Sequence, residues 1–164
     1  MACAASLAVQ NVIEEENLLE NIRIQGAYLG LSVTIRLVEQ KKSKNGLIIG
    51  KLLQERLTGP NSLASPYTFD VRGGGGFWAV EFDFSSDKNV VDFKGESFAM
   101  LAQARALENG LIVMGMVGGA NLEGTKGDHI ILAPAYNVTK EEIENIVEIF
   151  VRSVEEILSE SGVQ

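Results

Sequence analysis

At 164 residues, the chain has the length of one domain with a hydrophobic core. Its net charge of −8 argues against a nucleic-acid surface, because phosphate binding relies on clustered Lys and Arg, and no apolar run approaches the ~20 residues that span a membrane. Its single cysteine, Cys3, and single histidine, His129, exclude an internal disulfide and a Cys/His zinc site, so we expect a reduced, metal-free, intracellular protein.

The chain starts with a predicted helix. Small and apolar side chains occupy every face of residues 2–10, which is typical of a helix buried among neighbours, so we expect another part of the protein to cover it. No Arg-rich or basic-then-apolar targeting segment is visible, which favours a cytoplasmic or otherwise intracellular location. A second, amphipathic helix is predicted to pack on a core through side chains at helical spacing, namely Leu18, Leu19, Ile22 and Tyr28.

Residues 31–50 differ in character from both of their neighbours. They begin β-branched, pass through the basic, turn-prone run KKSKNG and end in an apolar patch. We interpret them as an insertion into one continuous helix, and a short in-frame intron read as coding would account for it. Helical spacing resumes after this segment and stops at Gly59 and Pro60; its apolar positions are Leu52, Leu53 and Leu57.

The stretch YTFDVRGGGGFWAVEFDF predicts two strands joined near Gly73–Gly76. In the second strand Phe77, Ala79 and Glu81 lie on one face, and the residues between them lie on the other. Four consecutive glycines resemble a phosphate loop, but a Walker loop or a dinucleotide fingerprint opens a helix, and here a strand follows. A turn or bulge that needs positive φ is the favoured interpretation.

A helix is predicted over residues 96–110, ended by Asn109 and Gly110. Its core-facing side chains are Phe98, Leu101, Ala102 and Ala106. The apolar run LIVMGMV, residues 111–117, predicts a buried strand, and a glycine-rich loop follows it.

The strand HIILAPA and a long final helix close the chain. Thr139 and Glu142 form the pattern of a capping box, and apolar residues recur at helical spacing from Ile143 to Leu158. The order of elements predicts an α+β domain, in which a small antiparallel or mixed sheet packs against helices.

In this order, the motifs resemble the C-terminal part of class III pyridoxal-phosphate-dependent aminotransferases, the ω-aminotransferase group of fold type I. The matching stretches are the small-residue helix ACAASLAVQNVIEEENLLENI, the Arg-Gly-x-Gly hairpin VRGGGGFWAVEF, the helix-to-strand step LENGLIV, and the closing strand and helix GDHIILAPAYNVTKEEIENIVEIF. The resemblance implies a homodimer in which a large pyridoxal phosphate (PLP) domain carries a small C-terminal domain that closes over the substrate. Residues 1–164 resemble that small domain as a single unit.

The resemblance places the PLP ring, its phosphate pocket and the lysine that bonds the cofactor in the large domain. PLP chemistry requires that lysine and an acidic partner for the pyridine nitrogen. We therefore assign no catalytic or cofactor-binding residue and expect no PLP to bind this chain. The lysines, none of which matches the family's strand-end lysine, are Lys41, Lys42, Lys44, Lys51, Lys88, Lys94, Lys126 and Lys140.

Two positions are candidates for substrate binding by resemblance. Ile131 stands where many family members carry an arginine that forks a substrate carboxylate, and an isoleucine cannot supply that bidentate pair; alternatively, Ile131 is a core residue. Arg72 matches the hairpin arginine, for which a structural role, bonding loop carbonyls, is favoured over a substrate role. His129 is interpreted as a strand-edge residue rather than a general base. Ala135 replaces the family's second proline, which leaves the local turn geometry open.

Three functions stay open. The first is a fragment of a class III transaminase, which moves an amino group from an amine or ω-amino acid to an oxo acid or aldehyde and needs the large domain; Met1 stands where the family has an internal residue. The second is a free-standing small domain that docks on an aminotransferase or another partner. The third is an unrelated acidic binding module. An exposed apolar patch larger than roughly a few hundred Å² along residues 2–9 would favour the first two over the third.

Overall fold

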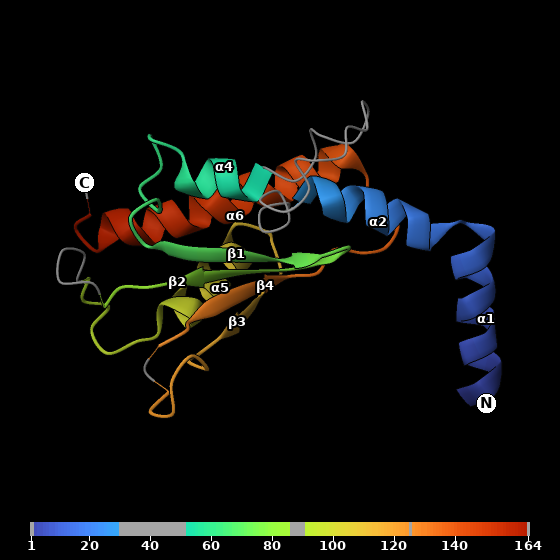
Figure 1. Ribbon diagram of the computed structural model, residues 1–164, viewed down its shortest axis with the longest axis horizontal. Coiled ribbons are helices and arrows are strands. Elements are labelled where there is room, and N and C mark those ends of the chain that lie inside the picture. The colour runs from blue at the N-terminus through green and yellow to red at the C-terminus, as the bar shows by residue number, and fades with distance from the viewer. Residues whose placement is uncertain (1, 30–51, 86–90, 125, 164) are drawn as a thin grey trace, which may run out of the picture.

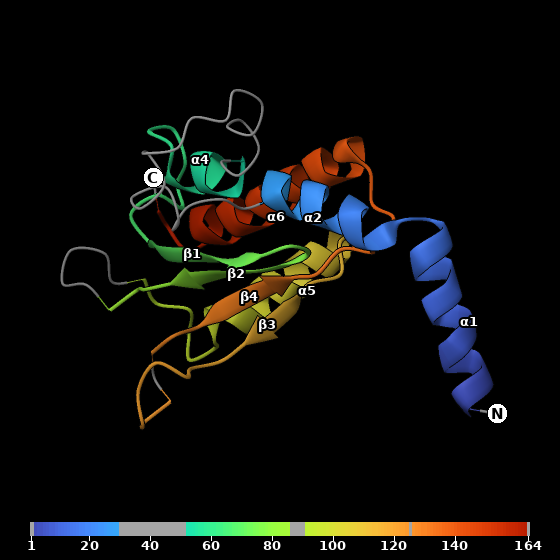
Figure 2. The same cartoon turned by 45° about the vertical axis from the view of Figure 1, so that its right-hand side comes forward.

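The computed structural model describes residues 2–29, 52–85, 91–124 and 126–163. Within them, a four-stranded antiparallel sheet in the order β1-β2-β4-β3 has its helices on one face (Figures 1 and 2). The strands are β1 (Thr68–Gly74), β2 (Phe77–Phe82), β3 (Met114–Met116) and β4 (His129–Leu132). The described helices are α1 (Ala2–Glu15), α2 (Leu18–Leu29), α4 (Leu52–Thr58), α5 (Phe98–Glu108) and α6 (Lys140–Glu160). The predicted α+β fold class is confirmed.

The predicted capping box at the start of α6 is confirmed. The Thr139 hydroxyl accepts a hydrogen bond from the Glu142 N–H at 3.2 Å, and the Glu142 carboxylate accepts one from the Thr139 N–H at 2.7 Å. Two N–H groups that have no partner within the helix are thereby satisfied. The helix buries one apolar stripe, and its buried side chains are Ile143, Val147, Phe150, Ser153, Val154, Ile157 and Leu158.

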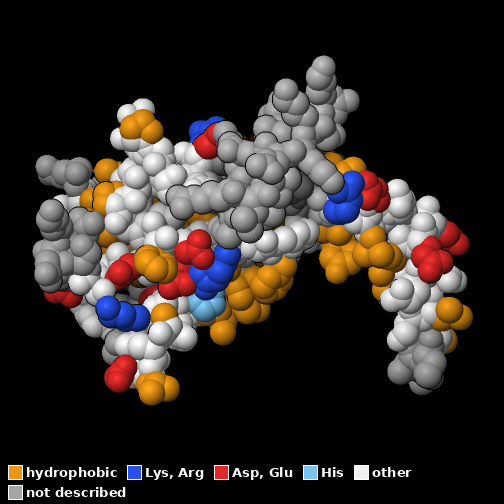
Figure 3. Space-filling model, in the orientation of Figure 1, with side chains coloured by type: hydrophobic (Ala, Val, Ile, Leu, Met, Phe, Trp, Pro, Cys, Tyr) orange, Lys and Arg blue, Asp and Glu red, His pale blue; other side chains and the backbone are white. Residues whose placement is uncertain are grey.

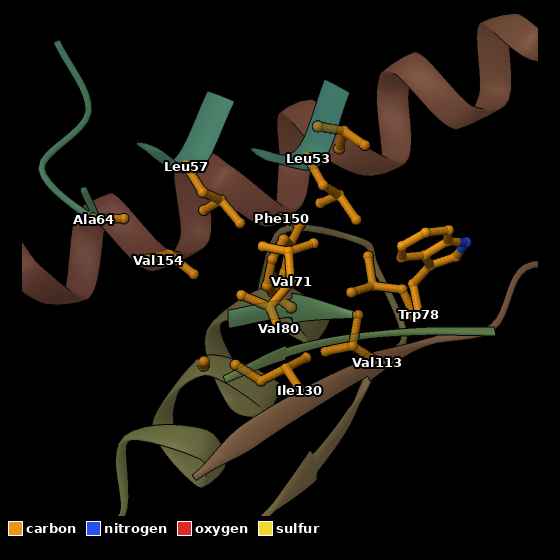
Figure 4. Close-up of a cluster of buried hydrophobic side chains, with 14 of the residues drawn as sticks. Leu53, Leu57, Ala64, Val71, Trp78, Val80, Val113, Ile130, Phe150 and Val154 are labelled. Atoms are coloured by element: carbon orange, nitrogen blue, oxygen red, sulfur yellow. The ribbon is translucent and has the colours of Figure 1, made fainter. Parts of the chain in front are cut away.

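The core lies between the sheet and the layer of α4 and α6 (Figure 4). Leu53 and Leu57 of α4 are fully buried, as the leucine spacing predicts. Strand β2 alternates as expected, since Trp78, Val80 and Phe82 are buried, whereas the residues between them face the other side of the sheet. The hairpin turn needs positive φ, which Gly75 supplies at 54°.

The cover expected over α1 does not come from the described residues of this chain. The helix forms, but it projects from the body beside α2 (Figures 1 and 2), and residues 4–12 are exposed; Leu7 is 64% and Val9 57% exposed. No described residue covers these side chains. Leu19 of α2 is also exposed, whereas Ile22 reaches the core. Exposed apolar side chains of this kind are typical of a surface that another part of a protein covers.

The apolar run at residues 111–117 is an edge strand rather than the predicted buried strand. Only β3 is paired, and it pairs on one side with β4. Ile112 is 86% and Met114 56% exposed, whereas Val113 is buried and Gly115 faces α5. A strand with helices on one face can bury only every second side chain, so an unbroken apolar run leaves half of its residues on the open face.

Two further expectations concern the end of β4 and the proposed insertion. Strand β4 ends at Leu132, before Pro134, whereas the sequence suggested a strand through Ala135. The proposed insertion at residues 31–50 lies outside the described residues. No helix in the described part of the chain is long and apolar enough to cross a membrane.

Candidate functional site on the open face of the sheet

The face of the sheet that points away from the core carries every candidate side chain named from the sequence. The strand register aligns Arg72, Ala79, Ile131 and Met114 in one row across this face. The neighbouring row contains Asp70, Glu81, His129 and Met116. No described helix packs on these two rows, and Figure 3 shows the pale-blue histidine there between charged and hydrophobic side chains.

Arg72 is neutralised by two carboxylates on this face. Its Nη1 donates hydrogen bonds to Glu81 Oε2 and, at 3.3 Å, to Asp70 Oδ2. Burial by itself would lower the pKa of Arg72, but these two hydrogen bonds outweigh it and hold the pKa above its ordinary value. The hydrogen bonds described for Arg72 go to carboxylates, and not to the loop carbonyls that the sequence suggested. A guanidinium held in this way offers little charge to a substrate carboxylate.

Ile131 lies at the centre of the open face. It stands opposite Ala79 of β2 and Met114 of β3, and it is half-buried. Its neighbour Ile130 points the other way and is fully buried in the core. The side chain therefore adds an apolar patch to the open face and offers no hydrogen-bond donor there. Its relation to the family's carboxylate-binding arginine stays a prediction.

His129 begins β4, opposite Glu81 and Met116. Its Nδ1–H donates to the carbonyl oxygen of Gly127 at 2.7 Å, because a carbonyl can only accept. In the neutral ring, Nε2 is then left as the acceptor. The histidine is thus tied to the loop that precedes its strand, and its position at the strand's first residue agrees with a strand-edge role.

Asp128 is a residue to which the sequence assigned no role. Its Oδ2 accepts hydrogen bonds from Ser97 Oγ at 2.6 Å and Ala99 N at 3.3 Å, and its Oδ1 accepts one from Gly118 N at 2.9 Å. It therefore holds together the start of α5, the glycine-rich loop and β4. Ser97 makes no cap bond of its own, so a carboxylate distant in sequence caps this helix. The feature of the sequence that could have indicated this role is an aspartate placed between a glycine-rich loop and a strand.

The described residues do not fit PLP. Lys94, Lys126 and Lys140 are all exposed, whereas a lysine that bonds the cofactor needs an enclosed site that lowers its pKa. A hollow of about 620 Å³ lies at the end of the sheet where β4 begins. Its charged lining groups are Lys126 and the carboxylates Glu81, Asp83, Glu96 and Asp128. This excess of negative charge repels a phosphate group. No three His, Cys, Asp or Glu side chains in the described ranges are placed to hold a metal ion.

A scan against protein-family models matches none. The chain is 32% identical over 147 residues to a Gibberella zeae protein named aminotransferase, a match that covers 90% of this chain and 24% of that protein. It is 28% identical over 156 residues to an uncharacterized aminotransferase of Schizosaccharomyces pombe, covering 94% of this chain and 28% of the relative.

Solved transaminase structures match over the same extent. A transaminase from directed evolution by ancestral reconstruction is 28% identical, with a TM-score of 0.66 over 96% of this chain and 27% of that one. A Bacillus anthracis aminotransferase, at 23% identity and a TM-score of 0.63, shares the fold over 94% of this chain. The chain is therefore similar to aminotransferases over nearly its whole length, and it spans about a quarter of the length of the curated relatives it matches.

Proposed function

We propose that the chain is the C-terminal small domain of a class III, PLP-dependent transaminase of the ω-aminotransferase group, and that it does not transaminate by itself. The parent enzyme moves an amino group from an amine or ω-amino acid to an oxo acid or aldehyde. The observation that carries the proposal is the extent of the structural match, which takes in 96% of this chain but 27% of a transaminase at a TM-score of 0.66.

The partner in this proposal is the large PLP domain, within a homodimer. Two apolar surfaces of the described chain support it. The exposed side of α1 includes Leu7 and Val9, and the open face of the sheet includes Ile131 and Met114. Surfaces of this kind mark sites of protein contact, because water does not solvate them favourably. Docking of a large domain would remove both from water.

The cofactor belongs to that partner in the proposal. The exposed lysines and the acidic hollow of this chain support a cofactor site elsewhere in the parent enzyme. A direct test mixes the purified chain with PLP, reduces the mixture with borohydride and measures the mass and absorbance of the product. The proposal requires no stoichiometric adduct, and an adduct at one defined lysine would refute it.

The genomic sequence upstream of the Met1 codon separates this proposal from its alternative. An open frame that encodes a large domain with its cofactor-bonding lysine is expected. Its absence from both gene and transcript would favour a free-standing small domain that docks on an aminotransferase or another protein through the same two apolar surfaces.

A further inference from the structure

Helix α2 lies against two loops at the same end of the sheet. One is the tip of the β1–β2 hairpin, Gly73–Gly76, and the other is the turn formed by residues 135–138, between β4 and α6. In Figure 1 this end of the sheet is also where the projecting α1 joins α2. The three segments are distant in sequence, so specific contacts must hold them together.

Helix α2 and the hairpin tip approach closely at two glycines, backbone to backbone at Gly26 and backbone to side chain at Gly76. A Cβ placed on Gly26 would lie 1.5 Å from the Gly75 carbonyl oxygen, and a Cβ on Gly76 would lie 2.4 Å from Ile22 Cγ1. Only glycine allows so close an approach. Gly75 and Gly76 of the four-glycine run therefore allow α2 to pack closely on the hairpin, in addition to forming its turn.

The contact between α2 and the 135–138 turn is polar and depends on one side chain. Asn21 Nδ2 donates hydrogen bonds to the Tyr136 carbonyl oxygen at 2.7 Å and to the Val138 carbonyl oxygen at 3.0 Å. Both partners are acceptors, so the amide nitrogen must face them, and the orientation of the carboxamide follows from its surroundings. The turn closes on itself through a hydrogen bond from Val138 N to Ala135 O at 3.1 Å.

We propose that Asn21 is a positioning residue that holds the 135–138 turn in place against α2. One element rests on the proposed function: by resemblance, Ile131 of β4 stands where the family binds a substrate carboxylate, so Asn21 sets the position of the backbone just beyond that residue.

The test replaces the donor without changing the size of the side chain. Asn21→Asp presents a carboxylate to two carbonyl oxygens and can no longer donate, and Asn21→Leu removes the polar group altogether. Asn11→Asp makes the same chemical change on the exposed part of α1 and is the matched control. Hydrogen exchange of the full chain, read by mass spectrometry, compares peptides over residues 134–139 with peptides over β2 and α6.

Both Asn21 variants are expected to accelerate exchange of the 134–139 peptide about tenfold, a factor that corresponds to ~1.4 kcal/mol at 25 °C. The control and the other peptides should not change. Unchanged exchange at the turn in a folded Asn21 variant would overturn the proposal. Acceleration spread evenly over the chain, or loss of the folded state in both variants, would also overturn it, because Asn21 would then support the core as a whole.

This experiment needs neither PLP nor a large domain, so its outcome is independent of the tests of the proposed function. If those tests fail, the exchange result still decides whether Asn21 ties the turn to α2. Only the relation of that turn to a substrate site would be withdrawn.

Discussion

Replacing Gly26 by alanine tests whether the packing of α2 on the hairpin tip sets the stability of the domain. In an exposed helix this substitution stabilises by up to about 1 kcal/mol, because alanine has the higher helix propensity. Here the new methyl group would lie 1.5 Å from the Gly75 carbonyl oxygen and 1.9 Å from its carbon. Neither atom belongs to a flexible side chain, so the helix or the hairpin must shift.

The steric term outweighs the propensity term. Overpacking typically costs about 1–3 kcal/mol, and a clash with backbone lies at the upper end of that range. We therefore expect Gly26→Ala to lower the free energy of unfolding by about 2 kcal/mol, which corresponds to roughly 4–8 °C in Tm for a domain of this size. The gain in helix propensity is already included in this difference.

Gly74→Ala is the matched control, because a Cβ at Gly74 meets no atom within 4 Å although it lies in the same hairpin. Urea and thermal unfolding followed by circular dichroism at 222 nm measure both variants. The control should stay within about 0.5 kcal/mol of the parent chain. Equal stability of the two variants would refute the reasoning, since the close approach of α2 would then have no energetic consequence.

Four further outcomes are expected. A hydrogen bond from the Thr139 backbone N–H lowers the pKa of Glu142 in the folded chain. The stabilisation that Glu142 contributes is therefore present above its unfolded pKa and is lost as the pH falls through its folded pKa. Glu142→Gln should make the free energy of unfolding less dependent on pH in that acidic range. Asp128→Ala removes three hydrogen bonds and should cost about 1–3 kcal/mol in chemical denaturation, and a neutral effect would contradict the role assigned to it. Deleting residues 31–50 should leave Tm unchanged or raise it, whereas a loss of more than ~2 kcal/mol would show that the segment belongs to the domain. The chain alone should self-associate in light scattering and Leu7→Lys should reduce this; a clean monomer at high concentration would count against the exposed α1 as its cause.

Local chemistry allowed several elements to be predicted from the sequence alone. The capping box of α6 needs only Thr139 and Glu142 at their spacing, and the long apolar stripe that follows can be buried on one side of a helix and in few other ways. The alternation in β2 and the glycine turn before it are equally local. These patterns, in their order, were also sufficient to indicate the aminotransferase resemblance.

The open face of the sheet and the contacts at its ends could be identified only from the tertiary structure. Whether an apolar run such as residues 111–117 is buried depends on what covers each side of the sheet, and the hydrophobicity of the run does not predict this. The same holds for α1, whose apolar faces stay exposed in the described chain. Pairings over long sequence distances, such as Asp128 with the start of α5 and Asn21 with the turn after β4, follow from the strand register and the place of α2. Side chains of these types are common on any surface, so only their three-dimensional neighbours distinguish them from solvated residues.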